Sequence, residues 1–409
     1  MLSVDAHLAD CLAAITPLPA REVALLEAVG CLLAEDVVSA IDMPRFDNSS
    51  MDGYAVRVAD LASAGPGAAV ALPVLGDIPA GHAEEIRLEP GTTLRIMTGA
   101  PLPAGADAVV PVEWTDGGAD RVLIERAPAL AQHVRRSGED VRAGQTVLKV
   151  GARLSPRHIA LLAAVGRDRV LIQPRPLVVV MPSGSELVPP GKALGPGQIH
   201  DSNGYGLIAA VRELGAEAEH GGVIDDVPES VTRMLAAAAR RADLVITTGG
   251  VSAGVYDTVK EVLRELGTVR FDKVAMQPGM PQGFGTIGDD ATPIFTLPGN
   301  PVSALVSFEV FVRPALLRLA GEGSVERGTV PVTAAVGWRS PAGKRQFVRA
   351  RLERSDGEEL QVRPVGGQGS HLVADLAEAT CLVVVAEEVT EVSAGDQVSC
   401  LVLDQQGRW

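Results

Sequence analysis

Three short glycine-containing segments carry most of the side chains that could do chemistry, and each directly follows an apolar run. Pro-Ser-Gly-Ser-Glu-Leu (182–187) follows LVVVM, the stretch 248–257 follows VIT, and Leu-Pro-Gly-Asn-Pro-Val-Ser (297–303) follows IFT. Small residues let backbone N–H groups turn inward, and a following helix adds the positive end of its dipole. Each segment could therefore hold a phosphate or another oxyanion, although one such turn alone is more often a tight connection.

Acidic residues lie among these segments, namely Glu186, Asp201 and Asp257. Mg²⁺ is commonly held by one or two carboxylates together with substrate phosphates, so these acids indicate a Mg²⁺ site. For Asp201, which precedes Ser202 and Asn203, a helix N-cap is an equally good interpretation. Three such loops with interspersed acids are hard to explain by packing alone, and we interpret them as one site.

The elements that position these loops alternate between short apolar strands and helices from Leu177 onwards. Helices are predicted from Ser202 to Leu214, from Pro228 to Ala239, from Thr258 to Leu266, and from the PGNP turn to Leu319. Such alternation predicts a mostly parallel, doubly wound sheet with helices on both faces. Ligands of these sheets bind beyond the carboxyl ends of the strands, which is where the three loops lie.

The rest of the chain predicts further domains around this α/β domain, which we place at 177–322. Apolar residues at helical spacing, first Leu8, Leu12 and Ile15 and then Leu25, Val29, Leu32 and Leu33, predict helix throughout the first forty residues. Ser155 and Pro156 begin a further helix, so we expect a discontinuous helical base formed by 1–40 and 141–176. Short β-prone runs between Gly and Pro predict an inserted β-rich domain over 41–140. A β pattern over 323–409 predicts a small C-terminal β-barrel. The expected fold class is thus multidomain α/β plus β.

The composition excludes several classes of protein. The net charge of −15 argues against a general nucleic-acid binder, and the longest apolar stretches are too short to span a membrane. The four cysteines lie far apart with no CxxC pair, as is typical of reduced, buried thiols: Cys11, Cys31, Cys381 and Cys400. The start, MLSVDAHLAD, shows no signal-peptide pattern, so we expect a cytoplasmic protein.

Motifs in a fixed order link the chain to a known family. The α/β region holds Pro-Ser-Gly-Ser-Glu-Leu, Asp-Ser-Asn, Thr-Thr-Gly-Gly-Val-Ser and Leu-Pro-Gly-Asn-Pro-Val-Ser. FDNSSMDGYA (46–55), RIMTGA (95–100) and SGED (137–140) precede them, and GQGSH (367–371) follows. From roughly residue 40 to 372, the chain resembles the molybdopterin molybdenumtransferases, the family of the MoeA proteins and the E domain of gephyrin.

This resemblance implies an activity and an assembly. Members of the family deliver molybdate to the dithiolene sulfurs of adenylylated molybdopterin, and Mg²⁺-dependent cleavage of the phosphoanhydride releases AMP. The resemblance implies a homodimer whose shared active sites combine the third and fourth domains with the partner's second domain. It also implies contact with the molybdopterin adenylyltransferase and with the apo-molybdoenzymes that receive the cofactor. The α/β domain is then the molybdopterin-binding domain.

Roles for individual residues also follow from the resemblance. The implied catalytic residues are Asp52, Thr98, Asp140, Glu186 and Asp257, with Glu186 and Asp257 as the metal ligands. The implied substrate-binding residues are Ser183, Gly184, Ser185, Asp201, Ser202, Gly249, Gly250, Ser252, Lys273, Pro298, Gly299, Asn300, Pro301, Arg345, Arg349 and Ser370. Within that set, Arg349 and Ser370 match the positions assigned to molybdate. Without the resemblance, we would interpret the basic residues near Arg349 as a charged strand edge that prevents aggregation.

One segment departs from the family pattern. Where the family often has Lys-x-x-x-Lys-Pro-Gly-Lys-Pro, this chain reads Lys273-Val-Ala-Met-Gln277-Pro-Gly-Met280-Pro, so two expected cations are missing. We therefore expect weaker capture of the oxyanion.

Two alternative functions remain open. One is adenylylation of molybdopterin by ATP, because the α/β domain resembles those adenylyltransferases as well. The other is a non-enzymatic scaffold that has kept the fold. The additional β-rich and barrel domains favour insertion over the first, and the retained Glu186, Asp257, Thr98 and Ser370 argue against the second.

Overall fold

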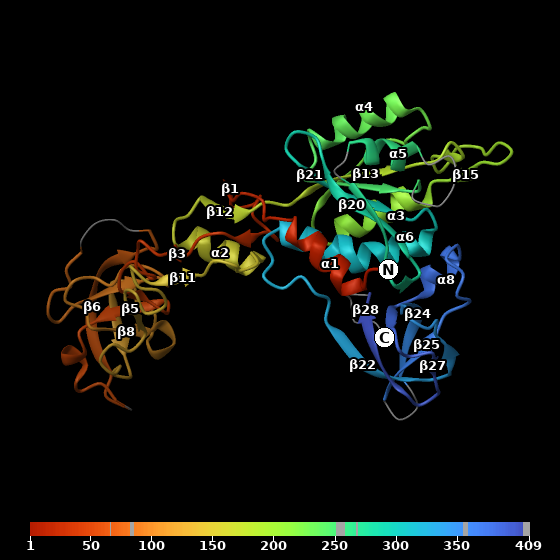
Figure 1. The fold of residues 1–409 in the computed structure, drawn as a ribbon. Helices are drawn as coiled ribbons and strands as arrows, with labels where there is room; N and C mark the ends of the chain where they lie inside the picture. Colours follow the sequence, from red (N-terminus) through yellow and green to blue (C-terminus); the bar gives the residue numbers. More distant parts are fainter. Residues whose placement is uncertain (66, 82–85, 251–257, 267–268, 355–358, 404–409) are drawn as a thin grey trace. The chain divides into compact units, whose positions relative to one another are not determined.

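A computed structural model describes residues 1–65, 67–81, 86–250, 258–266, 269–354 and 359–403 (Figure 1). The chain separates into two compact units. The first contains Met1–Glu22, Gly30–Leu32 and Leu171–Trp409, and the second contains Val23–Val29 and Leu33–Val170. The four-domain boundaries expected from the sequence are finer than this division and stay a prediction.

A six-stranded sheet forms the centre of the first unit, with strand order β16-β13-β17-β21-β20-β18. The strands are β13 (Leu177–Pro182), β16 (Glu217–His220), β17 (Leu244–Thr248), β18 (Val269–Lys273), β20 (Pro281–Ile287) and β21 (Thr292–Leu297). β16, β13, β17 and β21 are parallel, while β20 and β18 are antiparallel. The predicted mostly parallel sheet is confirmed.

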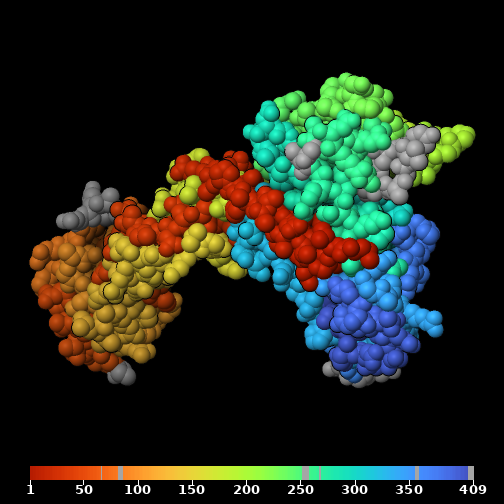
Figure 2. Space-filling model, viewed as in Figure 1, coloured from red at the N-terminus to blue at the C-terminus, as the bar shows by residue number. Residues whose placement is uncertain are grey.

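Helices cover both faces of this sheet, as predicted. The first face carries α1 (Val4–Ala13), α3 (Ser202–Glu213), α6 (Pro301–Ser307), a π-helical turn (Phe308–Val312) and α7 (Arg313–Leu319). The second face carries α4 (Pro228–Ala239) and α5 (Thr258–Glu265). Alternate residues of β13 supply the two cores, because Val178 and Val180 pack in the first and Val179 in the second. Figure 2 shows the segment with α1 lying on the outside of this layer.

A closed barrel follows the α/β layer in the first unit. It contains β22 (Thr329–Ala334), β24 (Arg345–Arg354), β25 (Leu360–Pro364), β26 (Cys381–Val385) and β28 (Gln397–Val402), paired in the ring β24-β25-β22-β28-β26-β24. The predicted C-terminal barrel is confirmed. A sixth strand, β19 (Met276–Gln277), leaves the α/β layer and pairs in parallel with β24, so that Gln277 lies opposite Gln346.

Short elements complete the first unit. β14 (Leu187–Val188) pairs with β15 (Ile199–His200), and β23 (Trp338–Arg339) pairs with β27 (Glu391–Val392). Helix α8 (Val373–Glu378) follows the GQGSH segment.

The second unit is β-rich over residues 41–140, the region predicted to form a β-rich domain. Its five-stranded sheet has the order β8-β5-β7-β6-β9. The strands are β5 (Gly53–Val56), β6 (Val70–Ile78), β7 (Thr93–Ile96), β8 (Ala108–Pro111) and β9 (Arg121–Ile124). Two small pairs accompany it, β3 (Val37–Val38) with β11 (Thr146–Leu148) and β4 (Asn48–Ser49) with β10 (Val134–Arg135). Short 3₁₀ turns span Val58–Leu61 and Val112–Trp114, and helix α2 spans Pro156–Ala164.

The prediction of helix throughout the first forty residues was wrong beyond Ala13. β1 (Arg21–Ala24) and β2 (Leu32–Leu33) occupy the region expected to form a second helix, and β12 (Arg169–Gln173) follows α2. Pro17 and Pro19 lack the N–H that a helix needs, and Leu33 instead exchanges backbone hydrogen bonds with Gly151 and Ala152. The apolar spacing there serves tertiary packing.

Two further expectations concern cysteines and membranes. None of the four cysteines forms a disulfide, and all four are buried, as predicted. Within the described ranges, no helix combines the length and the apolar character needed to cross a bilayer.

Candidate active site

A cavity of about 610 Å³ opens at the carboxyl ends of the parallel strands of the α/β layer. We call it the loop cavity, because the three predicted glycine-containing loops line it. The predicted site residues in its wall are Ser183, Glu186, Asp201, Ser202, Gly249, Gly250, Pro298, Gly299, Asn300 and Pro301. His200, Asn203, Thr248 and His371 line it as well. The structure thus brings together residues that the sequence placed in three separate segments.

The first loop favours glycine at position 184, because φ is positive there and the Glu186 carboxylate folds back over the turn. Gly184 has φ +149°, and a Cβ there would lie 2.5 Å from Oε2 of Glu186. The backbone turns tightly at this point, since the N–H of Leu187 donates to the Gly184 carbonyl over 3.1 Å. Glu186 therefore presents its carboxylate at the cavity wall from a constrained turn.

The second loop is in backbone contact with the other two. Gly249 has φ +90°, and a Cβ there would lie 2.6 Å from the carbonyl oxygen of Ser183. The N–H of Gly249 donates to the carbonyl of Leu297 over 3.1 Å, and a Cβ on Gly299 would lie 3.4 Å from the Gly249 Cα. The three loops therefore form one interlocked floor, and a side chain at Gly249 would separate it from the first loop.

Asn203 connects the second and third loops, a role that the sequence reasoning missed. Its Nδ2 donates to Oγ1 of Thr248 over 3.0 Å and to the carbonyl of Gly299 over 2.7 Å. Thr248, which is 2% exposed, donates in turn to the carbonyl of Pro298 over 3.0 Å. The Asp-Ser-Asn motif includes this asparagine and was the available signal. Only the structure, which places the start of α3 beside the end of β17, shows which groups its amide contacts.

Asp201 is a buried helix cap, one of the two interpretations that the sequence allowed. It is 2% exposed, and its Oδ1 accepts the N–H of Gly204 over 2.8 Å at the start of α3. Its Oδ2 accepts from Nε2 of His220 over 3.0 Å, because Nδ1 of that ring accepts the Gly222 N–H over 3.0 Å. Both carboxylate oxygens thus have protein partners, and Asp201 holds the first turn of α3 beside the loops.

Arg349 and Ser370 lie on the barrel side of this site. Arg349 is 5% exposed and donates to the carbonyls of Gly367 and, over 3.0 Å, Leu372. Burial lowers the pKa of Arg349, an effect that the nearby Asp375 partly offsets. Among the ion pairs of the described residues, none involves Arg349. This leaves a buried cation without a paired carboxylate, which favours an anionic ligand.

The segment 367–371 joins the barrel to the loop cavity. The carbonyl of Ser370 accepts the N–H of Val302 over 3.0 Å, which fixes the segment against the first turn of α6. His371, the next residue, lines the loop cavity. Ser370 therefore lies at the boundary between the three loops and the barrel.

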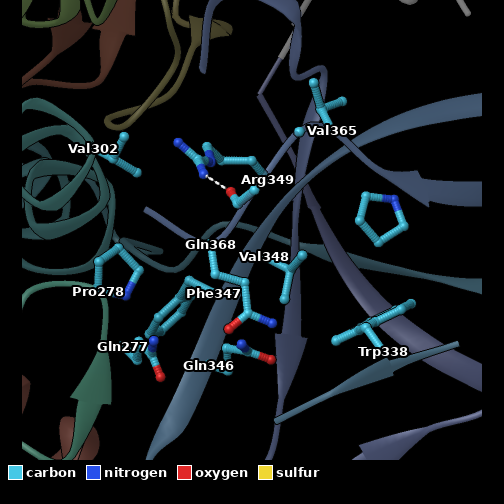
Figure 3. A pocket seen from close by; sticks show the side chains of 13 residues that line it. Gln277, Pro278, Val302, Trp338, Gln346, Phe347, Val348, Arg349, Val365 and Gln368 are labelled. Carbon is cyan, nitrogen blue, oxygen red and sulfur yellow. Dashed lines mark hydrogen bonds between the residues drawn. The ribbon is translucent and has the colours of Figure 1, made fainter. Parts of the chain in front are cut away.

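A second, smaller cavity of about 130 Å³ lies on the other side of this boundary (Figure 3). We call it the amide cavity, because three glutamine side chains line it: Gln277, Gln346 and Gln368. Arg349, Trp338 and a set of apolar residues complete its wall. The sequence reasoning named Gln277 only as a lost lysine and did not single out Gln346, Gln368 or Trp338.

Lys273 and Arg345, also expected at the site, line neither cavity. Lys273 is exposed at the end of β18, and its carbonyl accepts the N–H of Leu2 over 3.0 Å. Arg345 donates to both carboxylate oxygens of Asp5, over 2.6 and 2.9 Å, and pairs with Glu387 over 3.1 Å. The hydrogen bonds to Asp5 raise the pKa of Arg345. Their roles toward substrate stay predictions.

The second unit brings two of its three predicted site residues into contact. Oδ1 of Asp52 accepts the backbone N–H of Thr98 over 2.7 Å and its hydroxyl over 2.9 Å. These bonds, the backbone one foremost, lower the pKa of Asp52. Asp140 lies in a separate turn, where its backbone N–H donates to the carbonyl of Met43 over 3.0 Å.

Two carboxylates were predicted to hold Mg²⁺, and one of them belongs to the described residues. Glu186 is in the cavity wall, whereas Asp257 and Ser252 lie outside the described residues. Across the described parts of the chain, no three His, Cys, Asp or Glu side chains converge into a protein-only metal site. The wall carboxylate of Glu186, beside loops suited to phosphate, still fits Mg²⁺, which takes much of its coordination from substrate phosphates and water.

Family models match most of the chain in three consecutive pieces. Residues 2–166 match the MoeA N-terminal region (domain I and II), residues 179–318 match a probable molybdopterin binding domain, and residues 331–403 match the MoeA C-terminal region (domain IV). Both cavities fall within the second and third of these matches.

Curated relatives are similar along nearly their whole length. Molybdopterin molybdenumtransferase 2 of Mycobacterium tuberculosis is 46% identical, over 97% of this chain and 98% of the relative. The molybdopterin molybdenumtransferase of Haemophilus influenzae is 37% identical, over 92% of each chain.

Solved structures agree with these matches. Two molybdopterin biosynthesis MoeA proteins from Pyrococcus horikoshii superimpose with TM-scores of 0.81 and 0.74, at 33% and 27% identity. They cover 99% and 98% of this chain, and 99% and 100% of their own. Sequence, family models and fold agree, and the chain belongs to the molybdopterin molybdenumtransferase family.

Proposed function

We propose that this protein is a molybdenum insertase, which transfers molybdate to the dithiolene of adenylylated molybdopterin and releases AMP. The observation that carries the proposal is the arrangement of the loop cavity beside the buried cation of Arg349. One site is suited to a pyrophosphate, and the other, across Ser370, is suited to an oxyanion. The reaction requires these two sites close together.

The loop cavity suits the phosphoanhydride end of the substrate. Backbone N–H groups in the tight glycine turns can donate to phosphate oxygens. In this proposal Glu186 and Asp257 hold Mg²⁺, which would neutralise charge as the anhydride bond breaks. Ser183 and Asn300 orient the phosphates, and the fixed floor beneath them keeps the scissile bond in place.

Arg349 and Ser370 suit the molybdate. A buried guanidinium attracts a dianion strongly, and a neighbouring hydroxyl can donate to one of its oxygens. Lys273 and Arg345 belong to the proposed substrate-binding set, although neither lines the loop cavity or the amide cavity. Molybdate held at this boundary would meet the dithiolene sulfurs in the middle of the substrate.

We further propose a cytoplasmic homodimer with shared active sites. Asp52, Thr98 and Asp140 belong to the second unit and would complete the partner's loop cavity. Handling of a reactive cofactor also implies contact with the molybdopterin adenylyltransferase upstream and with apo-molybdoenzymes downstream.

Purified protein tests the activity directly. With adenylylated molybdopterin, molybdate and Mg²⁺, it should release AMP and generate a cofactor that activates an apo-nitrate reductase. Asp257→Ala should abolish AMP release while leaving the fold intact by circular dichroism. If the protein instead forms an AMP adduct from molybdopterin and ATP, the adenylyltransferase alternative is correct. No turnover in either assay would favour a scaffold.

Hybrid dimers test the sharing of sites. Mixing inactive Asp52→Ala and Asp257→Ala proteins should restore part of the activity, because one hybrid cleft carries neither substitution. No recovery, after subunit exchange has been demonstrated by mass, would show that each subunit works alone.

A further inference from the structure

The amide cavity contains buried polar groups without hydrogen-bond partners. Gln346 is 2% exposed, and its Oε1 has no partner within the described part of the chain. The same is true of the buried Nε1 of Trp338. Buried polar groups in native proteins are nearly always hydrogen-bonded, so an unpaired acceptor and an unpaired donor at one cavity call for an explanation. A ligand that offers both a donor and an acceptor would supply it.

The glutamines gather here because two domains share strand pairing. Gln277 on β19 lies directly opposite Gln346 on β24, so both side chains reach the same cavity. Gln368 is fixed by the bond from its Nε2 to the carbonyl of Arg339 over 3.1 Å. Figure 3 shows the three amides close together in the view, with Phe347 to one side and Trp338 to the other. An amide carries a donor and an acceptor side by side, so this wall can bind a matching amide-like edge.

The remaining wall suits a flat, neutral ring. It is formed by apolar side chains, among them Val302, Phe347, Val348 and Val365. Arg349, the cation among the described residues of this wall, already donates to two carbonyls and lies apart from Gln346 in Figure 3. An oxyanion among the amides would meet the acceptor oxygen of Gln346 and apolar surface, whereas a heterocycle would bury its faces and pair its edge.

The size of the cavity fits one small ring system. Its volume of about 130 Å³ is far below the roughly 300–1,000 Å³ of pockets that enclose drug-sized molecules. It therefore admits one end of the substrate and not the whole.

The amide and loop cavities adjoin along the chain. Pro301 lines the loop cavity and Val302 the amide cavity, while His371 lines the first and Gln368 the second. The hydrogen bond from Val302 N–H to the Ser370 carbonyl lies between them. A substrate with a phosphate at one end and a ring at the other would thus cross Ser370 in its middle.

We propose that the amide cavity binds the pterin ring of the substrate, with Gln346 and Trp338 as its specificity-determining residues. The ring carries an amino group and N–H donors next to a carbonyl acceptor, which complement Gln346 Oε1 and Trp338 Nε1. The identity of the ligand rests on the proposed function. With the pterin here and the pyrophosphate in the loop cavity, the dithiolene lies at Ser370 and Arg349.

Binding of 6-hydroxymethylpterin, which has neither dithiolene nor phosphate, tests this assignment. The pterin should quench tryptophan emission in the wild type and in Trp114→Phe, but not in Trp338→Phe. Gln346→Leu should weaken binding about tenfold, because it removes the acceptor while keeping the size. Gln397→Leu makes the same change at an exposed barrel position and should bind like the wild type.

Stability separates a binding role from a structural one. Gln346→Leu removes an unpaired buried carbonyl, so its Tm should equal or exceed that of the wild type while pterin binding falls. Unchanged pterin binding in Gln346→Leu would overturn the proposal, as would a loss of molybdate binding alone. A wild type that binds pterin through Gln346 but makes no molybdenum cofactor would refute the proposed function and leave this assignment standing.

Discussion

The loop cavity and the amide cavity are built in opposite ways. The loop cavity is shaped by backbone, since its floor consists of glycine turns so close together that a Cβ at Gly249 would collide with the carbonyl of Ser183. The amide cavity is shaped by side chains that project from four strands (β19, β23, β24 and β25), from the start of α6 and from the loop after β25. Backbone N–H groups suit phosphates in general, whereas placed side chains select one ligand. We infer that the first cavity supplies the chemistry and the second supplies specificity.

The sharpest test of this comparison is Glu186→Gln, which keeps the shape of the loop cavity and removes its charge. We expect AMP release to fall about a hundredfold or more, because metal capture and charge neutralisation both weaken. Single-turnover release of AMP across a Mg²⁺ titration measures it, and pterin binding should stay unchanged. Glu217→Gln, on exposed β16, is the control. A rate near the wild type would remove Glu186 from the chemistry.

Substitutions of Asn203 test whether the floor of the loop cavity depends on the hydrogen bonds of this side chain. Asn203→Ala loses two hydrogen bonds, and we expect a cost of about 1–3 kcal/mol in unfolding free energy with a raised KM for substrate. Asn203→Asp should cost more, because a carboxylate would face the Gly299 carbonyl. Urea unfolding and substrate titration measure the two effects. If both variants match the wild type, the loops are held by backbone alone.

A lysine at position 277 tests the neutrality of the amide cavity. Gln277→Lys adds a cation near Arg349, so we expect the molybdate concentration for half-maximal insertion to fall about five- to tenfold, while pterin binding weakens. Met280→Lys should do little, because Met280 lines neither cavity. The family pattern alone, with lysine expected at both positions, does not distinguish them. Molybdate titrations of both variants measure the two effects. A larger effect at position 280 would show that Met280, and not Gln277, faces the molybdate.

His7 lies outside both cavities, so it tests the pH dependence of folding stability separately from the site. Burial lowers its pKa, although Asp272 partly opposes this, and neither ring nitrogen has a hydrogen-bond partner within the described residues. The unfolded chain therefore binds the proton more readily, and stability present above about pH 6.5 is lost as the pH falls below it. His7→Leu should flatten this dependence by a small amount in urea unfolding between about pH 7.5 and 5.5. An unchanged slope would show that other groups control it.

The fold was largely predictable where its signals are local. Helix α4 was predicted with its observed ends because Pro228 suits the first turn and apolar residues repeat along one face. The loops of the active site were predictable for the same reason, as each follows its own strand. Asp52 and Thr98 were named only through the resemblance, and the hydrogen bonds between them could not be derived from spacing.

The amide cavity could not be predicted, because its members meet through tertiary pairing. Gln277 and Gln346 become neighbours only when β19 joins the barrel, and nothing near either residue announces that register. The prediction of helix over Arg21–Ala24 and Leu32–Leu33, where the structure has strands, was wrong for the same reason. Their partners lie far along the chain, so an apolar spacing compatible with helix was misleading.

The strand β19 has a consequence for how the barrel can be isolated or exchanged. It lies between β18 and β20 in the chain, yet its hydrogen bonds go to Arg345 and Gln346 at the start of β24. Along β24, strand β25 pairs only with residues from Ala350 onwards, so β19 covers main-chain groups of β24 that the ring leaves open. A barrel expressed alone would present that open edge, the kind through which separate chains pair and aggregate. The barrel therefore cannot be moved into another protein by itself. A chimaera that contains the barrel must also contain residues 276–277.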